Sequence, residues 1–214
     1  MKYKYVVFDW DGTLADTYPV ISAAYDYAFE KTRLKKIPYD EIKRITATMQ
    51  NKDIWGRLFG NMQEEAKNYY AEYIERYHIQ NLSTMSGAKK LLDFCRNHGL
   101  ESYLCTNKRT RFVKKELDYL NLQDYFKKIV AAGEYSEDKP SPIACREVFD
   151  NNLPAAKDIV VIGDGEADVK SAAALNGADC IIYDPNNMYK GIEPTYKVKD
   201  FAEIEAILEG KYGK

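Results

Sequence analysis

The stretch YVVFDWDGTLADT, residues 5–17, decides the fold. Residues 5–8 form a short apolar run that leads directly into Asp9 and Asp11. An apolar run without polar alternation is typical of a strand buried on both faces of a parallel sheet. Because side chains alternate along a strand, Asp9 and Asp11 are expected on the same side, one step apart. The segment therefore predicts a buried first strand that ends in two carboxylates.

Four more apolar runs follow, and segments with helical spacing separate them. The runs are SYLC (102–105), KIVAA (128–132), IVVIG (159–163) and CIIYD (180–184). The intervening segments carry helix boundaries, such as Ser141 as an N-cap with Pro142 at the first helical position. A repeated strand–helix unit predicts an α/β fold with a doubly wound parallel sheet.

One segment interrupts this alternation. Residues 16–84 show helical patterns only, with Tyr69, Tyr70 and Tyr73 on one stripe that we expect to be packed inside the segment. We therefore predict a core domain made of residues 1–15 and 85–214, and a small α-helical cap domain made of residues 16–84.

Composition excludes several classes of protein. The 214 residues carry a formal net charge of -2, which leaves no positive surplus for a nucleic acid. No apolar run approaches the roughly 20 residues needed to span a bilayer, and the first residues lack the pattern of a signal peptide. The four cysteines form no CxxC pair, so we expect them to be reduced and buried. These features predict a soluble, cytoplasmic protein with neither nucleic acid nor membrane as a partner.

The residues that follow the apolar runs are the candidates for a functional site, because ligands of open parallel sheets bind outside the carboxyl ends of the strands. These candidates are Asp9, Asp11, Thr106, Asn107, Lys139, Asp164 and Asp168. Clustered carboxylates need a cation to stay ionised together, and an oxygen-rich set suits Mg²⁺. The hydroxyl of Thr106 and the ammonium of Lys139 suit phosphate oxygens. The set predicts phosphoryl chemistry in which one aspartate attacks phosphorus while the other carries a proton.

The motifs FDWDGTLADT, LCTNK, DKPSP and IGDGEADVKSAAALNGA occur in this order, and together they resemble the four motifs of the haloacid dehalogenase superfamily. The likeness is to the phosphoglycolate phosphatase-like branch, which has a helical cap after the first strand. It covers about two-thirds of the chain. Dehalogenases of the superfamily lack the second aspartate, so Asp11 favours phosphoryl transfer.

The resemblance implies a role for each candidate residue. Asp9 would be the nucleophile and a Mg²⁺ ligand, and Asp11 the general acid/base, with its backbone carbonyl on the metal. Thr106 and Lys139 would hold the phosphoryl oxygens, and we expect neighbouring Asn107 to bind the phosphate too. Asp164 would be a metal ligand. Asp168 would be a ligand through water or a support for Lys139.

Three alternatives stay open. A hexose-phosphate mutase would use the same aspartates, and a receiver-like phospho-switch or a catalytically silent binding protein are more remote interpretations. The small phosphorylated metabolite that serves as substrate cannot be read from the sequence, although Arg44, Lys52 and Arg57 are candidates for contacting it. Glu166 is either an extra carboxylate on the metal side or part of the first turn of a helix. The sequence does not indicate the oligomeric state.

Overall fold

The computed structural model describes residues 1–48, 51–187, 191 and 193–212, without the side chains at 46–53. The described chain divides into two compact units, one made of Met1–Asp16 and Ser83–Lys214 and the other of Thr17–Leu82. Across the described ranges, none of the helices combines the length and the hydropathy that crossing a bilayer requires.

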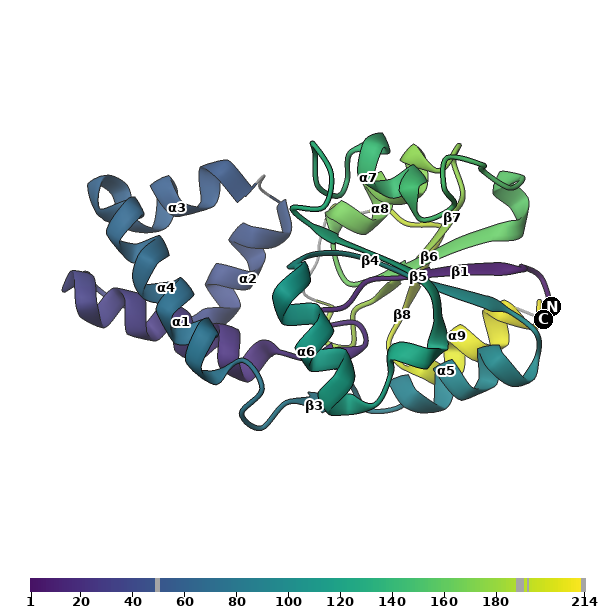
Figure 1. Cartoon of the computed structure of the whole chain (residues 1–214), viewed down its shortest axis with the longest axis horizontal. Coiled ribbons are helices and arrows are strands. Elements are labelled where there is room, and N and C mark those ends of the chain that lie inside the picture. The colour runs from purple at the N-terminus through teal and green to yellow at the C-terminus, as the bar shows by residue number, and fades with distance from the viewer. Residues whose placement is uncertain (49–50, 188–190, 192, 213–214) are drawn as a thin grey trace. The chain divides into compact units, whose positions relative to one another are not determined.

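The first unit is built on a six-stranded sheet whose neighbouring strands are all parallel (Figure 1). Its order is β5-β4-β1-β6-β7-β8. The strands are β1 (Tyr5–Phe8), β4 (Glu101–Arg109), β5 (Phe126–Ala132), β6 (Ile159–Gly163), β7 (Asp179–Tyr183) and β8 (Tyr196–Val198). The chain runs outward from β1 to β4 and β5, and then crosses to β6 on the other side of β1. In open α/β sheets, ligands bind at the carboxyl ends of the strands where the order reverses, which here is the carboxyl end of β1.

Helices cover both faces of this sheet, which confirms the predicted doubly wound class. Figure 1 shows α5 (Ala88–Asn97), α6 (Thr110–Leu120) and α9 (Phe201–Leu208) on one side, and α7 (Pro142–Glu147) and α8 (Glu166–Ala174) on the other. The first unit also has the short 3₁₀ turns η2 (Gln123–Tyr125) and η3 (Ala156–Asp158), and the second unit has η1 (Gly60–Met62). The predicted N-cap of α7 is present, since the Ser141 hydroxyl accepts a hydrogen bond from the Ile143 backbone N–H at 3.2 Å.

The second unit is helical. It contains α1 (Tyr18–Thr32), α2 (Tyr39–Thr48), α3 (Asn51–Phe59) and α4 (Gln63–Tyr77). The tyrosine stripe of α4 packs within this unit, as its spacing predicted: Tyr69 and Tyr70 lie against a core that includes Tyr25 and Phe29. The ring centroids of Tyr25 and Tyr70 are 4.9 Å apart.

Two strand pairings were not expected from the sequence. β2 (Ala15–Asp16) pairs antiparallel with β3 (Ser83–Thr84), so the segment from 16 to 84 is not purely helical. The edge strand β8 pairs with β7 although it has no apolar run. Both were missed because two or three residues are too few to show a period, and their backbone hydrogen bonds depend on a distant partner strand.

Candidate active site

Strand register brings the predicted site residues to one edge of the sheet. Phe8 is aligned with Leu104 on one side and with Ile162 on the other. Asp9 is the next residue of its strand, and its backbone N–H donates to the Ile162 carbonyl at 2.9 Å. Thr106 and Asp164 each lie two residues beyond these aligned positions. Asp9, Thr106 and Asp164 therefore lie at the same level of three neighbouring strands, although β4 itself continues to Arg109.

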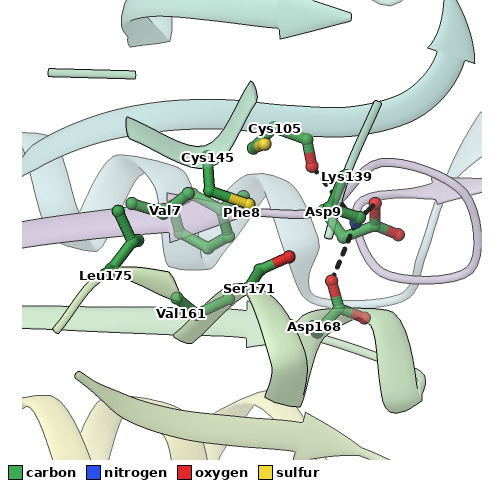
Figure 2. Close-up of a pocket in the computed structure, with 10 residues that line it drawn as sticks. All are labelled: Val7, Phe8, Asp9, Cys105, Lys139, Cys145, Val161, Asp168, Ser171 and Leu175. Atoms are coloured by element: carbon green, nitrogen blue, oxygen red, sulfur yellow. Dashed lines mark hydrogen bonds and ion pairs between the residues drawn. The ribbon is translucent and has the colours of Figure 1, made fainter. Parts of the chain in front are cut away.

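Lys139 is the buried lysine that contacts Asp9. Its Nζ donates to Asp9 Oδ1 at 2.5 Å, to Asp168 Oδ1 at 2.8 Å and to the Cys105 carbonyl at 3.2 Å (Figure 2). The side chains of all three charged residues are at most 9% exposed. Because a buried ammonium is costly without partners, its three acceptors explain how Lys139 can stay charged there.

Asp168 holds this cluster to the start of α8. Its Oδ2 accepts the backbone N–H groups of Asp164 and Gly165, at 3.1 and 3.0 Å, while Oδ1 accepts from Lys139. Both oxygens of this carboxylate are therefore already hydrogen bonded. This geometry favours Asp168 as the support of Lys139, which is one of the two roles that the resemblance left open.

The oxygens of Asp9, Asp164 and Asp168 form a group that can hold a metal ion, since one oxygen of each lies within 4.8 Å of the others. Three carboxylates against one ammonium leave a surplus of two negative charges, which is the charge of one divalent cation. A hard, all-oxygen donor set fits Mg²⁺. Asp11 is not in this group of carboxylates.

The surplus negative charge of the cluster affects the pKa values of Asp9 and Lys139. The pKa of Asp9 is raised to about 8: burial is the largest cause, the Lys139 ammonium opposes it, and the carboxylates of Asp168 and Asp164 add to it. Burial would lower the pKa of Lys139, but Asp168 and Asp9 hold it well above its ordinary value. A divalent cation beside Asp9 would favour the ionised carboxylate, because it adds positive charge.

Thr106 and Asn107, both in β4, add uncharged polar groups to the site. Thr106 is 3% exposed, and its hydroxyl oxygen accepts the Lys108 backbone N–H at 3.1 Å. The side-chain Oδ1 of Asn107 is buried and has no hydrogen-bond partner among the described residues. Thr106 keeps a hydroxyl proton to donate, and Asn107 keeps an amide that a bound ligand can engage.

Asp11 lies in a different environment from Asp9. Its side chain is 29% exposed, and its Oδ1 accepts from Lys108 Nζ at 2.7 Å. Lys108 Nζ also lies 3.0 Å from Glu116 Oε1, and Glu116 Oε2 accepts from the indole N–H of Trp10 at 2.6 Å. The two aspartates therefore pair with two different lysines.

The structure also shows what sequence reasoning missed. Glu116 was not a candidate, although it occupies the apolar face of α6 with Phe112, Val113 and Leu117, which are all buried. A carboxylate on an apolar stripe is the signal that could have identified it. Glu166 pairs with Lys170 at 2.8 Å, one turn along α8, so it belongs to the first turn of that helix. In the second unit, the Arg44 Nε donates to the Asp40 carbonyl, while the Lys52 side chain lies outside the described residues.

The sequence profile of the haloacid dehalogenase-like hydrolase family matches residues 6–181. The match covers well over half of the chain, so the chain belongs to this family of hydrolases, as its motifs predicted. A receiver-like phospho-switch is thereby overturned.

Two relatives and one solved structure show how the chain compares within the family. It is 25% identical to the "Putative pyrophosphatase PpaX" of Caldanaerobacter subterraneus subsp. tengcongensis, over 98% of this chain and 96% of that protein. It is 28% identical to the "Phosphoglycolate phosphatase" of Pseudomonas fluorescens, over 83% and 68% respectively. The "putative HAD-hydrolase YfnB" of Bacillus subtilis, described as bound to magnesium, has the same fold with a TM-score of 0.73 and 21% identity, over 97% and 99% of the chains.

Proposed function

We propose that this hydrolase is a Mg²⁺-dependent phosphatase that cleaves a small phosphate monoester through an aspartyl-phosphate on Asp9. The observation that carries the proposal is that the two aspartates lie in different environments. Asp9 is buried with Lys139 and two more carboxylates, while Asp11 is partly exposed and pairs with Lys108. Two carboxyl groups in different environments can perform two different tasks in one reaction.

In the first step, a carboxylate oxygen of Asp9 forms a bond to phosphorus while the bond to the leaving oxygen breaks. Asp11 donates a proton to that leaving oxygen, and Thr106 and Lys139 donate to the phosphoryl oxygens. In the second step, water attacks phosphorus, Asp11 takes its proton, and the bond between phosphorus and Asp9 breaks. Phosphate leaves and both aspartates return to their starting states.

Mg²⁺ would be held by Asp9 and Asp164, with the Asp11 backbone carbonyl as a third ligand and Asp168 in the role of support or of a ligand through water. When bound, it would neutralise charge on the phosphoryl group and favour ionised Asp9. Lys139 keeps Asp9 in place through its 2.5 Å contact, and it is itself oriented by Asp168 at 2.8 Å. Lys139 thus fixes the nucleophile, and Asp168 fixes Lys139.

The substrate class follows from the relatives and from the chemistry. The name phosphoglycolate phosphatase makes phosphoglycolate, a phosphate monoester, the first compound to assay, and the name pyrophosphatase PpaX makes pyrophosphate, an anhydride, the comparison substrate. The four cysteines are free and buried, which supports the proposed cytoplasmic location, since that compartment keeps thiols reduced.

A covalent adduct tests the mechanism directly. Asp11→Asn, incubated with p-nitrophenyl phosphate and Mg²⁺, should stall as an aspartyl-phosphate, because p-nitrophenolate leaves without acid help while hydrolysis needs the base. Mass spectrometry of the quenched protein should find a phosphoryl group on the peptide that contains Asp9, and none in Asp9→Asn. An adduct on Asp11, or solvent oxygen entering phosphate in a single turnover without any from Asp9, would contradict the mechanism. Release of inorganic phosphate from a sugar phosphate, without isomerised sugar phosphate, would separate the phosphatase from the mutase alternative.

A further inference from the structure

A buried polar chain lies beside Asp11, and the mechanism above does not use it. It consists of Trp10, Glu116 and Lys108, from β1's end, α6 and β4 respectively. The Glu116 and Lys108 side chains are 0% and 8% exposed, and Trp10 is fully buried. A carboxylate in such a place costs several kcal/mol by itself, so it is retained only with strong partners.

The partners of Glu116 use both of its oxygens. Oε1 lies 3.0 Å from Lys108 Nζ, and Oε2 accepts the Trp10 indole N–H at 2.6 Å. Burial raises the pKa of Glu116, and the Lys108 ammonium and the Trp10 N–H oppose that shift. With one oxygen on the ammonium and the other on the indole, the carboxylate has little rotational freedom.

Lys108 links the fixed carboxylate of Glu116 to the carboxylate of Asp11. Its Nζ is shared between Glu116 Oε1 at 3.0 Å and Asp11 Oδ1 at 2.7 Å, and its backbone N–H donates to Thr106 Oγ1 at 3.1 Å. An ammonium on a flexible four-carbon stem has many rotamers, and a second, immobile carboxylate selects one of them. The position of the Asp11 carboxylate therefore depends on a residue that does not touch it.

Trp10 connects the same carboxylate to the backbone between the two aspartates. Trp10 follows the end of β1 and its side chain is fully buried. Its backbone carbonyl accepts the N–H groups of Leu14 and Ala15, both at 3.0 Å, so the turn after it is closed. The indole contact with Glu116 therefore ties this turn to α6.

We propose that Glu116 is a positioning residue that, through Lys108 and Trp10, fixes the Asp11 carboxylate where it transfers protons. This inference rests on the proposed function, in which Asp11 is the general acid/base. Proton transfer by a placed side chain contributes about 10²–10⁴-fold to a rate, and a displacement of about 1 Å can cost on the order of 10²-fold. Loss of the Glu116 contacts should therefore slow the step that most needs Asp11.

The test is rapid mixing of the protein with p-nitrophenyl phosphate and Mg²⁺. The absorbance of p-nitrophenolate then shows two phases. The fast burst is the release that accompanies formation of the aspartyl-phosphate, and the steady-state phase is limited by hydrolysis of the aspartyl-phosphate. Glu116→Gln keeps the volume and the acceptor for Trp10 but removes the negative charge that faces the Lys108 ammonium. We expect its burst rate constant within about threefold of the wild type, and a steady-state rate per active site about 10–100-fold lower, in line with the cost of misplacing a proton-transfer group.

A matched control separates positioning from stability. Asp179→Asn removes a carboxylate that bonds Tyr3 and Lys2 at the amino end of β7, so it weakens the fold at the opposite edge of the sheet. It should leave the ratio of burst to steady-state rate unchanged. Trp10→Phe is a second variant, expected to lower the steady-state rate with the burst rate preserved, and it covers the case in which Glu116→Gln does not fold.

Each outcome decides the inference. If the steady-state rate per burst site is unchanged in the folded Glu116 variant, or in the Trp10 variant when the first does not fold, Glu116 is structural only and the positioning role is refuted, while the phosphatase proposal stands. If burst and steady-state rates per active site fall together, the positioning role is refuted in the same way. A wild type that does not turn over p-nitrophenyl phosphate with Mg²⁺ would instead overturn the proposed function, and the inference with it.

Discussion

Gly163 is the last residue of β6 and lies close to the carboxylate of Asp168. Adding one methyl group at Gly163 tests how little free space surrounds that carboxylate. A Cβ at position 163 would lie 2.0 Å from Asp168 Cγ and 2.2 and 2.5 Å from its two oxygens. Carbon atoms in contact stay about 3.5 Å apart. The carboxylate would have to move by about 1.5 Å, which its hydrogen bonds to Lys139, Asp164 and Gly165 oppose.

The expected cost of Gly163→Ala follows from these contacts. Overpacking a tight site costs about 1–3 kcal/mol, and a hydrogen bond to a charged group contributes about 1.5–3 kcal/mol. With partial relaxation we expect a loss of about 3 kcal/mol in the free energy of unfolding. For a chain of this size each kcal/mol lowers the thermal midpoint by about 2–4 °C, so the midpoint should fall by roughly 10 °C. Turnover should fall on the order of 10²-fold, because Asp168 orients Lys139.

Gly165→Ala is the matched control in the same loop. A Cβ at Gly165 would meet nothing within 4 Å, and its φ of -147° is extended backbone that alanine adopts. Calorimetry and turnover with p-nitrophenyl phosphate should show this control close to the wild type. If Gly163→Ala has the same midpoint and the same turnover as Gly165→Ala, the close approach of Asp168 to Gly163 is not what holds the site together.

Three further predictions follow from the site and from the opposite edge of the sheet. Chelation of divalent cations should abolish turnover, Mg²⁺ should restore it and Ca²⁺ should inhibit it, because the larger Ca²⁺ shell misplaces Asp9; full turnover in excess chelator would contradict the metal proposal. Thr106→Val should lower kcat/KM for p-nitrophenyl phosphate by at least about tenfold while Thr106→Ser stays near the wild type, since the serine keeps the hydroxyl; equal kinetics would exclude a phosphate contact. Burial would raise the pKa of Asp179, but the hydrogen bonds from Tyr3 and Lys2 lower it below its ordinary value, so its stabilising effect is present above pH 4 and lost at lower pH. Denaturant unfolding should show Asp179→Asn costing about 1 kcal/mol at pH 7 and about none near pH 2, and a constant difference would contradict this assignment.

The fold class was readable because its determinants are local. The central strands contain runs of adjacent apolar residues, such as Ile159–Gly163, which is buried along its whole length. Burial on both faces requires such a run whatever lies next to it, so the run alone predicts a parallel sheet. The candidate residues could also be recognised from the sequence, because they directly follow the apolar runs that predict the strands.

Only the tertiary structure decided which of these residues pair with one another. Lys108 and Asp11 are 97 residues apart and meet because β4 pairs with β1, while Glu116 and Trp10 are 106 apart and meet because α6 packs beside the sheet. The hydrogen bonds of Asp168 likewise depend on two backbone N–H groups, those of Asp164 and Gly165, that point toward it at the start of α8. Local periodicity records which side of an element is buried, but a pairing across the chain is determined by the packing of whole elements, and no neighbouring residue encodes it.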